Sequence, residues 1–190
     1  MRIRLVLSTA AIALLAAMPA FAQQPAGPHA ATPQREMSQQ DTNFMKEAAA
    51  GGLAEVELGK LAQQKAASVE VKNFGARMVR DHGNANEQLT EIATKKSVQL
   101  PQQLDPQHAQ KRDQLAGLRG ADFDRAYMSD MVKDHDKDIQ AFRHEAQTGQ
   151  DPDLRRFARD TLAVIEQHDQ MAHKTQNSIV GVGSSHPPRR

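Results

Sequence analysis

The sequence of 190 residues contains no cysteine and no tryptophan, and aromatic residues make up only 4% of it. The absence of cysteine excludes a disulfide, a thiolate metal site and a lipid anchor attached to a cysteine. Few aromatic rings leave few platforms on which bases or sugars could stack. Ala, Leu, Gln, Glu and Lys dominate instead, and these residues favour helices. A chain of this length has room for one domain, whose stability must come from packing.

The chain also lacks a strong excess of charge of either sign. It has 24 basic and 23 acidic residues, and two of the basic residues, Arg2 and Arg4, lie in its first 22 positions. Removal of those positions would leave a net charge of −1 and no basic tract. We therefore expect no binding to nucleic acid or to an anionic lipid surface.

The first 22 residues have the three parts of a secretory signal peptide. Arg2 and Arg4 precede an apolar run from Leu5 to Ala17, and Ala20-Phe21-Ala22 forms an A-x-A cleavage site. A run of 13 residues is too short to span about 30 Å of hydrocarbon, and no later segment is long and apolar enough to do so. The pattern predicts a soluble protein that is periplasmic or otherwise exported, with no transmembrane segment in its mature form.

The rest of the sequence divides into a linker, a helical domain and a tail. Residues 23–40 are rich in Pro, Ala and Gln without apolar periodicity, which predicts a disordered linker. Residues 179–190 are mostly Gly, Ser, Pro and Arg and predict a disordered tail. Between these segments, from residue 41 to 178, apolar residues recur at helical spacing and predict one helical domain.

Capping and proline signals predict five helices in this domain. The predicted bounds are Asp41 or Thr42 to about Ala66, Ser68 to Ser97, Pro106 to Leu118, Ala121 to Thr148 and Pro152 to about Asn177. Gly51-Gly52 inside the first helix predicts a close helix contact or a bend. The connections near Ala67 and Gln150 suit antiparallel hairpins, whereas residues 98–120 are long enough to cross the molecule. The predicted fold is all-α, a ferritin-like four-helix bundle with a long crossover carrying a short extra helix.

Two of the predicted helices carry the same short pattern. Met78-Val79-Arg80-Asp81-His82 recurs 53 residues later as Met131-Val132-Lys133-Asp134-His135. In each copy the Met and the His are four residues apart and therefore share one face of a helix. Both histidines can thus point toward a common centre. A shared ancestral core pattern would explain the repeat without any ligand.

One ionisable residue interrupts the apolar face of each long helix, close to the middle of that helix. These residues are Glu55, His82, His135 and His168. Within the uncertainty of the predicted helix ends, they form one layer. Neutral imidazoles and a carboxylate suit Zn, Fe, Mn or Cu, so the layer is a candidate site for one metal ion. The alternative is a hydrogen-bonded network between Glu55 and the histidines that only stabilises the core.

Other residues beside this layer bear on the choice of metal. Met78, Met131 and Met171 each lie one helical turn from a histidine and, with the predicted crossover, on the same side of the layer. Thioethers beside imidazoles make Cu(I) a candidate, and methionines that only fill the core are the alternative. The aspartates that adjoin the histidines in sequence are expected to point away into solvent, because neighbours on a helix point apart. They are Asp81, Asp134 and Asp169.

Six segments of the domain resemble those of a bacterial exported family, domain of unknown function 4142. They are Phe44-Met45-Lys46-Glu47-Ala48, Gly52-Leu53-Ala54-Glu55-Val56-Glu57-Leu58-Gly59, the two Met-x-x-x-His patterns, Phe123-Asp124-Arg125-Ala126-Tyr127 and Glu166-Gln167-His168-Asp169-Gln170-Met171-Ala172. The resemblance covers about Asp41 to Gln176. It implies a ferritin-like helical fold, in a family whose members are often labelled as membrane or outer-membrane proteins and which has no established activity.

The sequence lacks the ligand pattern of di-iron ferritins. Those sites use Glu-x-x-His, whereas Val79, Val132 and Ile165 stand three positions before the histidines. No other motif pairs a nucleophile with a base, so we do not expect an enzyme. We expect an exported bundle with an envelope or stress-related role that holds one metal ion. A metal-free structural or interaction module of the envelope is the alternative, and a metal-dependent oxidoreductase is the least favoured. The pattern indicates neither an envelope partner nor an oligomeric state.

Overall fold

The computed structural model describes residues 37–183, and these residues form five helices and no strand. The helices are α1 (Gln39–Lys65), α2 (Val69–Lys95), α3 (Pro106–Ala116), α4 (Gly120–Thr148) and α5 (Pro152–Gly183). The all-α prediction is confirmed for this part of the chain. The predicted signal peptide (1–22) and most of the predicted linker (23–40) and tail (179–190) lie outside the described residues.

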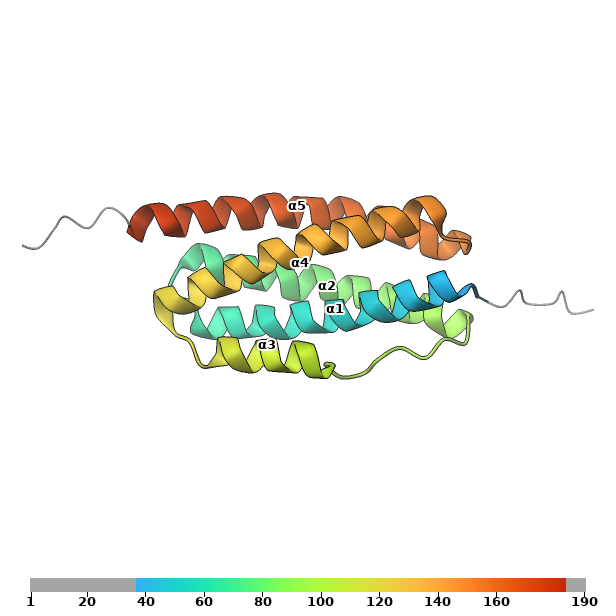
Figure 1. Ribbon diagram of the computed structural model, residues 1–190, viewed down its shortest axis with the longest axis horizontal. Coiled ribbons are helices and arrows are strands. Elements are labelled where there is room, and N and C mark those ends of the chain that lie inside the picture. The colour runs from blue at the N-terminus through green and yellow to red at the C-terminus, as the bar shows by residue number, and fades with distance from the viewer. Residues whose placement is uncertain (1–36, 184–190) are drawn as a thin grey trace, which may run out of the picture. The chain divides into compact units, whose positions relative to one another are not determined.

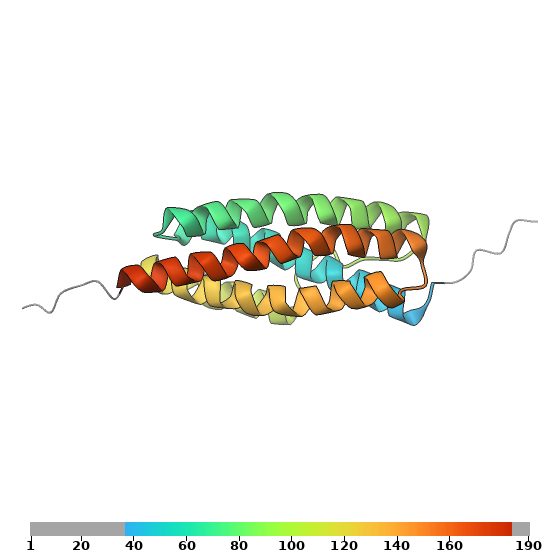
Figure 2. The same cartoon turned by 90° about the horizontal axis from the view of Figure 1, so that it is seen from above.

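The four long helices lie side by side, and the short α3 lies next to α1 (Figure 1). α1 packs on α2, and α4 on α5, along most of their lengths as antiparallel pairs (Figure 2). The connection between the two pairs returns along the helices and contains α3, so α2 and α4 run in the same direction. None of the described helices combines the length and the hydropathy that a membrane span requires.

The core consists of two apolar clusters that follow one another along the helices. The Phe74 cluster lies toward the α1–α2 turn and contains Phe74, Phe123 and Tyr127 among its buried residues. The Phe142 cluster lies toward the α4–α5 turn and contains Leu89 and Phe142. Four buried ionisable residues, one on each long helix, lie between the residues of the two clusters along that helix. They are Glu55, His82, His135 and His168.

Glycines bring α1 and α2 close together. A Cβ on Gly59 would lie 2.6 Å from the carbonyl oxygen of Gly75, and a Cβ on Gly75 would lie 2.7 Å from the carbonyl oxygen of Gly59 and 2.7 Å from the Cβ of Ala62. A Cβ on Gly52 would overlap the side chain of Asn86. The close contact predicted for the Gly51-Gly52 pair is therefore present at Gly52, whereas a side chain at Gly51 would meet open space.

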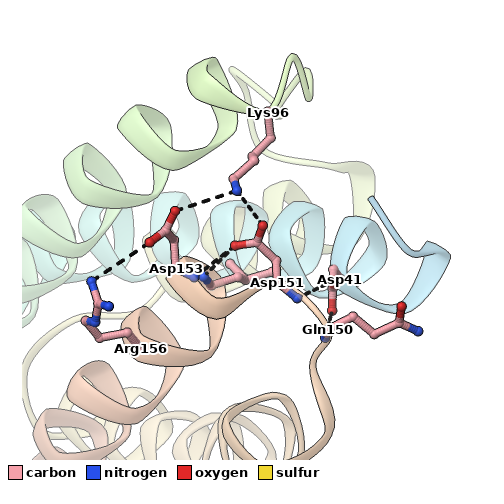
Figure 3. Close-up of polar contacts among 7 residues, drawn as sticks. Asp41, Lys96, Gln150, Asp151, Asp153 and Arg156 are labelled. Atoms are coloured by element: carbon pink, nitrogen blue, oxygen red, sulfur yellow. Dashed lines mark hydrogen bonds and ion pairs between the residues drawn. The ribbon is translucent and has the colours of Figure 1, made fainter. Parts of the chain in front are cut away.

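α1 begins two residues before the predicted Asp41, and Ser38 is its N-cap. The Ser38 hydroxyl accepts a hydrogen bond from the Asp41 backbone N–H at 3.0 Å. The buried Asp41 carboxylate accepts instead from the backbone N–H groups of Gln150 and Asp151 at 2.9 and 3.0 Å (Figure 3). The prediction that Asp41 or Thr42 caps α1 is wrong, because Ser38 caps this helix and the Asp41 side chain binds the α4–α5 turn.

The start of α5 is held by a second set of bonds at the same turn. Asp151 caps α5, because one of its carboxylate oxygens accepts from the backbone N–H groups of Asp153 and Leu154, both at 3.0 Å. The Lys96 ammonium, just after α2, binds the carboxylates of Asp151 at 2.5 Å and Asp153 at 3.6 Å (Figure 3). These contacts join α1, α2 and α5 at this end of the molecule.

α5 continues to Gly183, past the predicted end near Asn177. Ile179 packs against the Phe74 cluster, so the apolar face of the helix continues beyond Asn177. Residues 179–183 are therefore helical, and the prediction that the disordered tail begins at residue 179 is wrong for these residues.

The Asp124 carboxylate binds backbone N–H groups of the α1–α2 turn, as the Asp41 carboxylate binds those of the α4–α5 turn. Its buried carboxylate accepts from the backbone N–H groups of Ala67 and Ser68 at 3.0 and 2.8 Å. We expect Asp124→Ala to lower the free energy of unfolding by about 2 to 4 kcal/mol, because two backbone N–H groups lose their charged acceptor. Asp122→Ala on the same turn of α4, where the side chain is 73% exposed, should cost about 1 kcal/mol or less. Urea unfolding of both variants measures this difference, and equal losses would contradict the role of Asp124.

Candidate metal centre

His82 of α2, His135 of α4 and His168 of α5 meet between the two apolar clusters. Their ring centroids are 5.8 Å (His82 to His135), 5.3 Å (His82 to His168) and 5.5 Å (His135 to His168) apart, which makes a nearly regular triangle. One ligand nitrogen from each ring lies within 4.8 Å of the other two. The side chains are buried, with exposed fractions of 6%, 0% and 1% in the same order. The structure thus brings together all three histidines of the predicted layer.

Hydrogen bonds determine which nitrogen two of these rings offer to the centre. His135 Nδ1 lies 2.8 Å from the carbonyl oxygen of Met131, and His168 Nε2 lies 2.9 Å from Oδ2 of Asp81. A carbonyl and a carboxylate can only accept, so these ring nitrogens carry the protons and donate them. His135 Nε2 and His168 Nδ1 therefore carry lone pairs. Both atoms are buried without a hydrogen-bond partner, and so is His82 Nε2.

Two of the three rings, those of His82 and His168, stay neutral at neutral pH. Burial, reinforced by the neighbouring His135 and His168, lowers the pKa of His82 well below its usual 6.5. Burial also lowers the pKa of His168 to about 4, even though the hydrogen bond to Asp81 opposes this shift. Neither of these two rings therefore carries a second proton at pH 7 that could satisfy its unpartnered nitrogen. What the site can do is donate nitrogen lone pairs to a cation.

Asp81 orients His168 from the neighbouring helix. Besides accepting from His168, the carboxylate binds Arg77 and, at 3.1 Å, Arg80. Although burial opposes ionisation, hydrogen bonds from His168 and Arg77 lower the pKa of Asp81 below its usual value. The prediction that Asp81 points into solvent is wrong, because α5 packs over this face of α2. A carboxylate that holds the outer nitrogen of a histidine is a common support for metal ligands.

Glu55 is not brought into the histidine group. No oxygen of Glu55 joins the three ring nitrogens within 4.8 Å, so the predicted set of four ligands is reduced to three. The physical reason is its helix: α1 packs on α2, α3 and α4, whereas the third histidine comes from α5. Glu55 is nevertheless buried, and its Oε2 has no partner. Burial, together with the nearby negative charge of Asp134, raises the pKa of Glu55 to about 8.

The three methionines of the copper hypothesis pack on the same side of the histidines. Met78 and Met131 are fully buried in the Phe74 cluster, and Met171 packs against it. A thioether in this position can either contribute a ligand to copper or fill the core.

A second group of possible ligands lies on the outside of the α4–α5 pair. It consists of Asp136, Asp169 and His173, and only Asp169 is partly buried. Asp169 and His173 lie one turn apart, with 3.5 Å between a carboxylate oxygen and Nε2. Asp134, on the other side of α4, binds Lys111 of α3 at 2.5 Å. Asp134 thus faces a lysine and Asp169 a histidine, although the sequence predicted that both aspartates point into solvent. The solvent-facing group lacks the buried position of the histidine triangle, which is the stronger candidate.

Comparisons with known proteins concern the fold and the family. No curated protein matches the chain. The crystal structure of a DUF305 fragment from Deinococcus radiodurans is similar, with a TM-score of 0.66 and 11% sequence identity over 75% of this chain and 98% of that one. At this identity the likeness shows a shared helical fold. The model of the domain of unknown function DUF4142 matches residues 26–175, which is most of the sequence, and the chain therefore belongs to the DUF4142 family.

Proposed function

We propose that this chain is a ferritin-like four-helix bundle that binds one first-row transition-metal ion through His82, His135 and His168. The observation that carries the proposal is the set of three buried ring nitrogens that lack any partner. Each buried polar atom without a partner costs about 1 to 3 kcal/mol. A cation held by the three lone pairs would remove this cost at all three positions at once.

The donor set narrows the choice of metal. Three imidazoles and no thiolate suit Zn, Cu, Fe and Mn, and the usual order of affinities favours Cu and Zn over the other two. Three protein ligands leave a further coordination position for water or another group. A sulfur from Met78, Met131 or Met171 in that position would favour Cu(I).

The role we propose is metal binding in the cell envelope, in a stress-related or buffering capacity, and not catalysis. The enclosed position of the rings supports tight retention of an ion. Export is supported by the pattern of Arg2, Arg4, the apolar run and the A-x-A sequence at residues 20–22. The nonenzymatic role is supported by the lack of a paired nucleophile and base in the sequence.

Thermal unfolding with added metal tests the proposal. Zn²⁺ or Cu(I) at a hundredfold excess over its Kd should stabilise the wild-type protein by about 2.7 kcal/mol. His135→Ala should abolish this gain, whereas His144→Ala, at an exposed position of the same helix, should keep it. Met131→Leu should weaken binding of Cu(I) selectively if a thioether takes part, while leaving the core filled. A wild-type melting temperature that neither metal changes would leave the metal-free envelope module as the better account.

A further inference from the structure

We propose, on the basis of the proposed function, that the metal ion reaches and leaves the three histidines through a cleft between α2 and α5. The two helices are neighbours (Figure 2), and the cleft between them has a volume of about 340 Å³. The polar residues among those that line it are Arg77, Asp81, Asn84 and Gln88 from α2 and Asp160 and Thr161 from α5.

Asp81 connects this cleft to the histidine triangle. Its carboxylate lines the cleft and also accepts the hydrogen bond from His168 at 2.9 Å. His82, the next residue along α2, is the most exposed of the three histidines. His168 thus lies directly behind the Asp81 carboxylate, which stands between the cleft and this corner of the triangle.

The chemistry of the walls suits a hydrated cation on its way to stronger ligands. Carboxylate, amide and hydroxyl oxygens can replace water around a divalent ion one ligand at a time. Asp160 is exposed on the wall and adds negative charge, which raises the local concentration of cations. Arg77 is the cationic side chain on the walls, and its guanidinium is paired with Asp81. Imidazoles bind transition metals more strongly than neutral oxygens do, so an ion gains affinity as it moves inward.

The other sides of the molecule offer less room for an ion. Close contacts at Gly52 and Gly59 lie on either side of the middle of the α1–α2 interface. α4 and α5 pack on each other along most of their lengths. On the remaining side, α3 lies over α1 and its Lys111 binds Asp134 of α4. α2 and α5 are in contact over a shorter part of their lengths than either antiparallel pair. The cleft is therefore the favoured path.

Filling the cleft should slow metal exchange without changing metal affinity. A higher barrier on the path used for both entry and exit slows both rates equally, so their ratio is unchanged. The test variant is Asn84→Phe, on the cleft wall, and the control is Glu87→Phe, at an exposed position of α2 outside the cleft. Loading is followed after mixing metal-free protein with Zn²⁺ alone, release after adding excess chelator, and Kd by competition at equilibrium.

We expect Asn84→Phe to slow loading and release of Zn²⁺ by tenfold or more, with Kd within threefold of the wild type. Glu87→Phe should leave all three quantities within threefold. Thr161→Phe, on the opposite wall, should act like Asn84→Phe and provides a second folded variant if the first is unstable. Unchanged rates in a folded wall variant, or a change in Kd with only one rate affected, would overturn the route but not the proposed function. A wild-type protein that binds no Zn²⁺ and no Cu(I) would overturn both.

Discussion

Replacing His135 by leucine should not lower the free energy of unfolding of the metal-free protein, and should raise it by up to about 2 kcal/mol. Leucine has a similar volume and removes a buried nitrogen, Nε2, that has no partner. The hydrogen bond lost at Nδ1 goes to the Met131 carbonyl, four residues earlier, which is also the acceptor for the His135 backbone N–H within the helix. The same substitution should eliminate stabilisation by metal, because one of three ligands is gone. The free energy of unfolding, measured in urea with and without Zn²⁺, gives both results.

His144→Leu is the matched control, because this histidine is exposed on the same helix. It should change the free energy of unfolding of the metal-free protein by no more than about 0.5 kcal/mol. The stabilisation by metal should stay as in the wild type. A loss of 2 kcal/mol or more in metal-free His135→Leu would favour the alternative interpretation, in which the histidine ring is held by core hydrogen bonds and contributes only to packing.

The metal-free protein should become less stable as the pH rises from 5 to 8, and Glu55→Gln should reduce this loss. Burial raises the pKa of Glu55 from 4.5 to about 8 in the folded protein. Between these two pKa values the folded state keeps a proton that the unfolded state releases. The contribution of Glu55 to the free energy of unfolding is therefore fully present below pH 4.5 and is lost as the pH rises to about 8. The loss from this one group is up to about 1.4 kcal/mol per pH unit. Asp138 and Glu145, whose pKa values burial raises to about 7, contribute with the same sign. His82 and His168, whose pKa values burial lowers, contribute with the opposite sign below about pH 6.5, but they are unchanged in Glu55→Gln and so do not affect the comparison.

The measurement for this prediction is the slope of unfolding free energy against pH, taken in the presence of a chelator. Glu55→Gln should have a shallower slope than the wild type, since glutamine does not titrate. Glu57→Gln provides the control, because the side chain of Glu57 is 44% exposed on the same helix. Equal slopes for the wild type and Glu55→Gln would mean that Glu55 ionises in the folded state without cost.

Local signals in the sequence were enough to predict the helices and several of their ends. Ser68, Asp105 and Asp151 each cap the helix that follows them, because an N-cap bond joins residues only two or three positions apart. The meeting of His82, His135 and His168 was also predictable, since each interrupts an apolar helix face near its middle and apolar faces pack against each other.

Contacts that depend on how helices pack could not be predicted in this way. The partner of Asp41 lies 110 residues away in the next pair of helices, and His168 lies 87 residues from Asp81. Glu55 was predicted to join the histidines because it lies on the apolar face of α1. The neighbour that such a residue faces depends on the rotation of its helix and on which helices are adjacent. The periodicity of one helix gives no information on either.

X-ray absorption at the zinc edge of the Zn²⁺-loaded wild-type protein tests the metal-site proposal most directly. The proposal predicts one ion per chain, with imidazole nitrogens from three rings at about 2.0 to 2.1 Å from the metal. An ion surrounded only by oxygen, or a protein that retains no ion after dialysis, would contradict it.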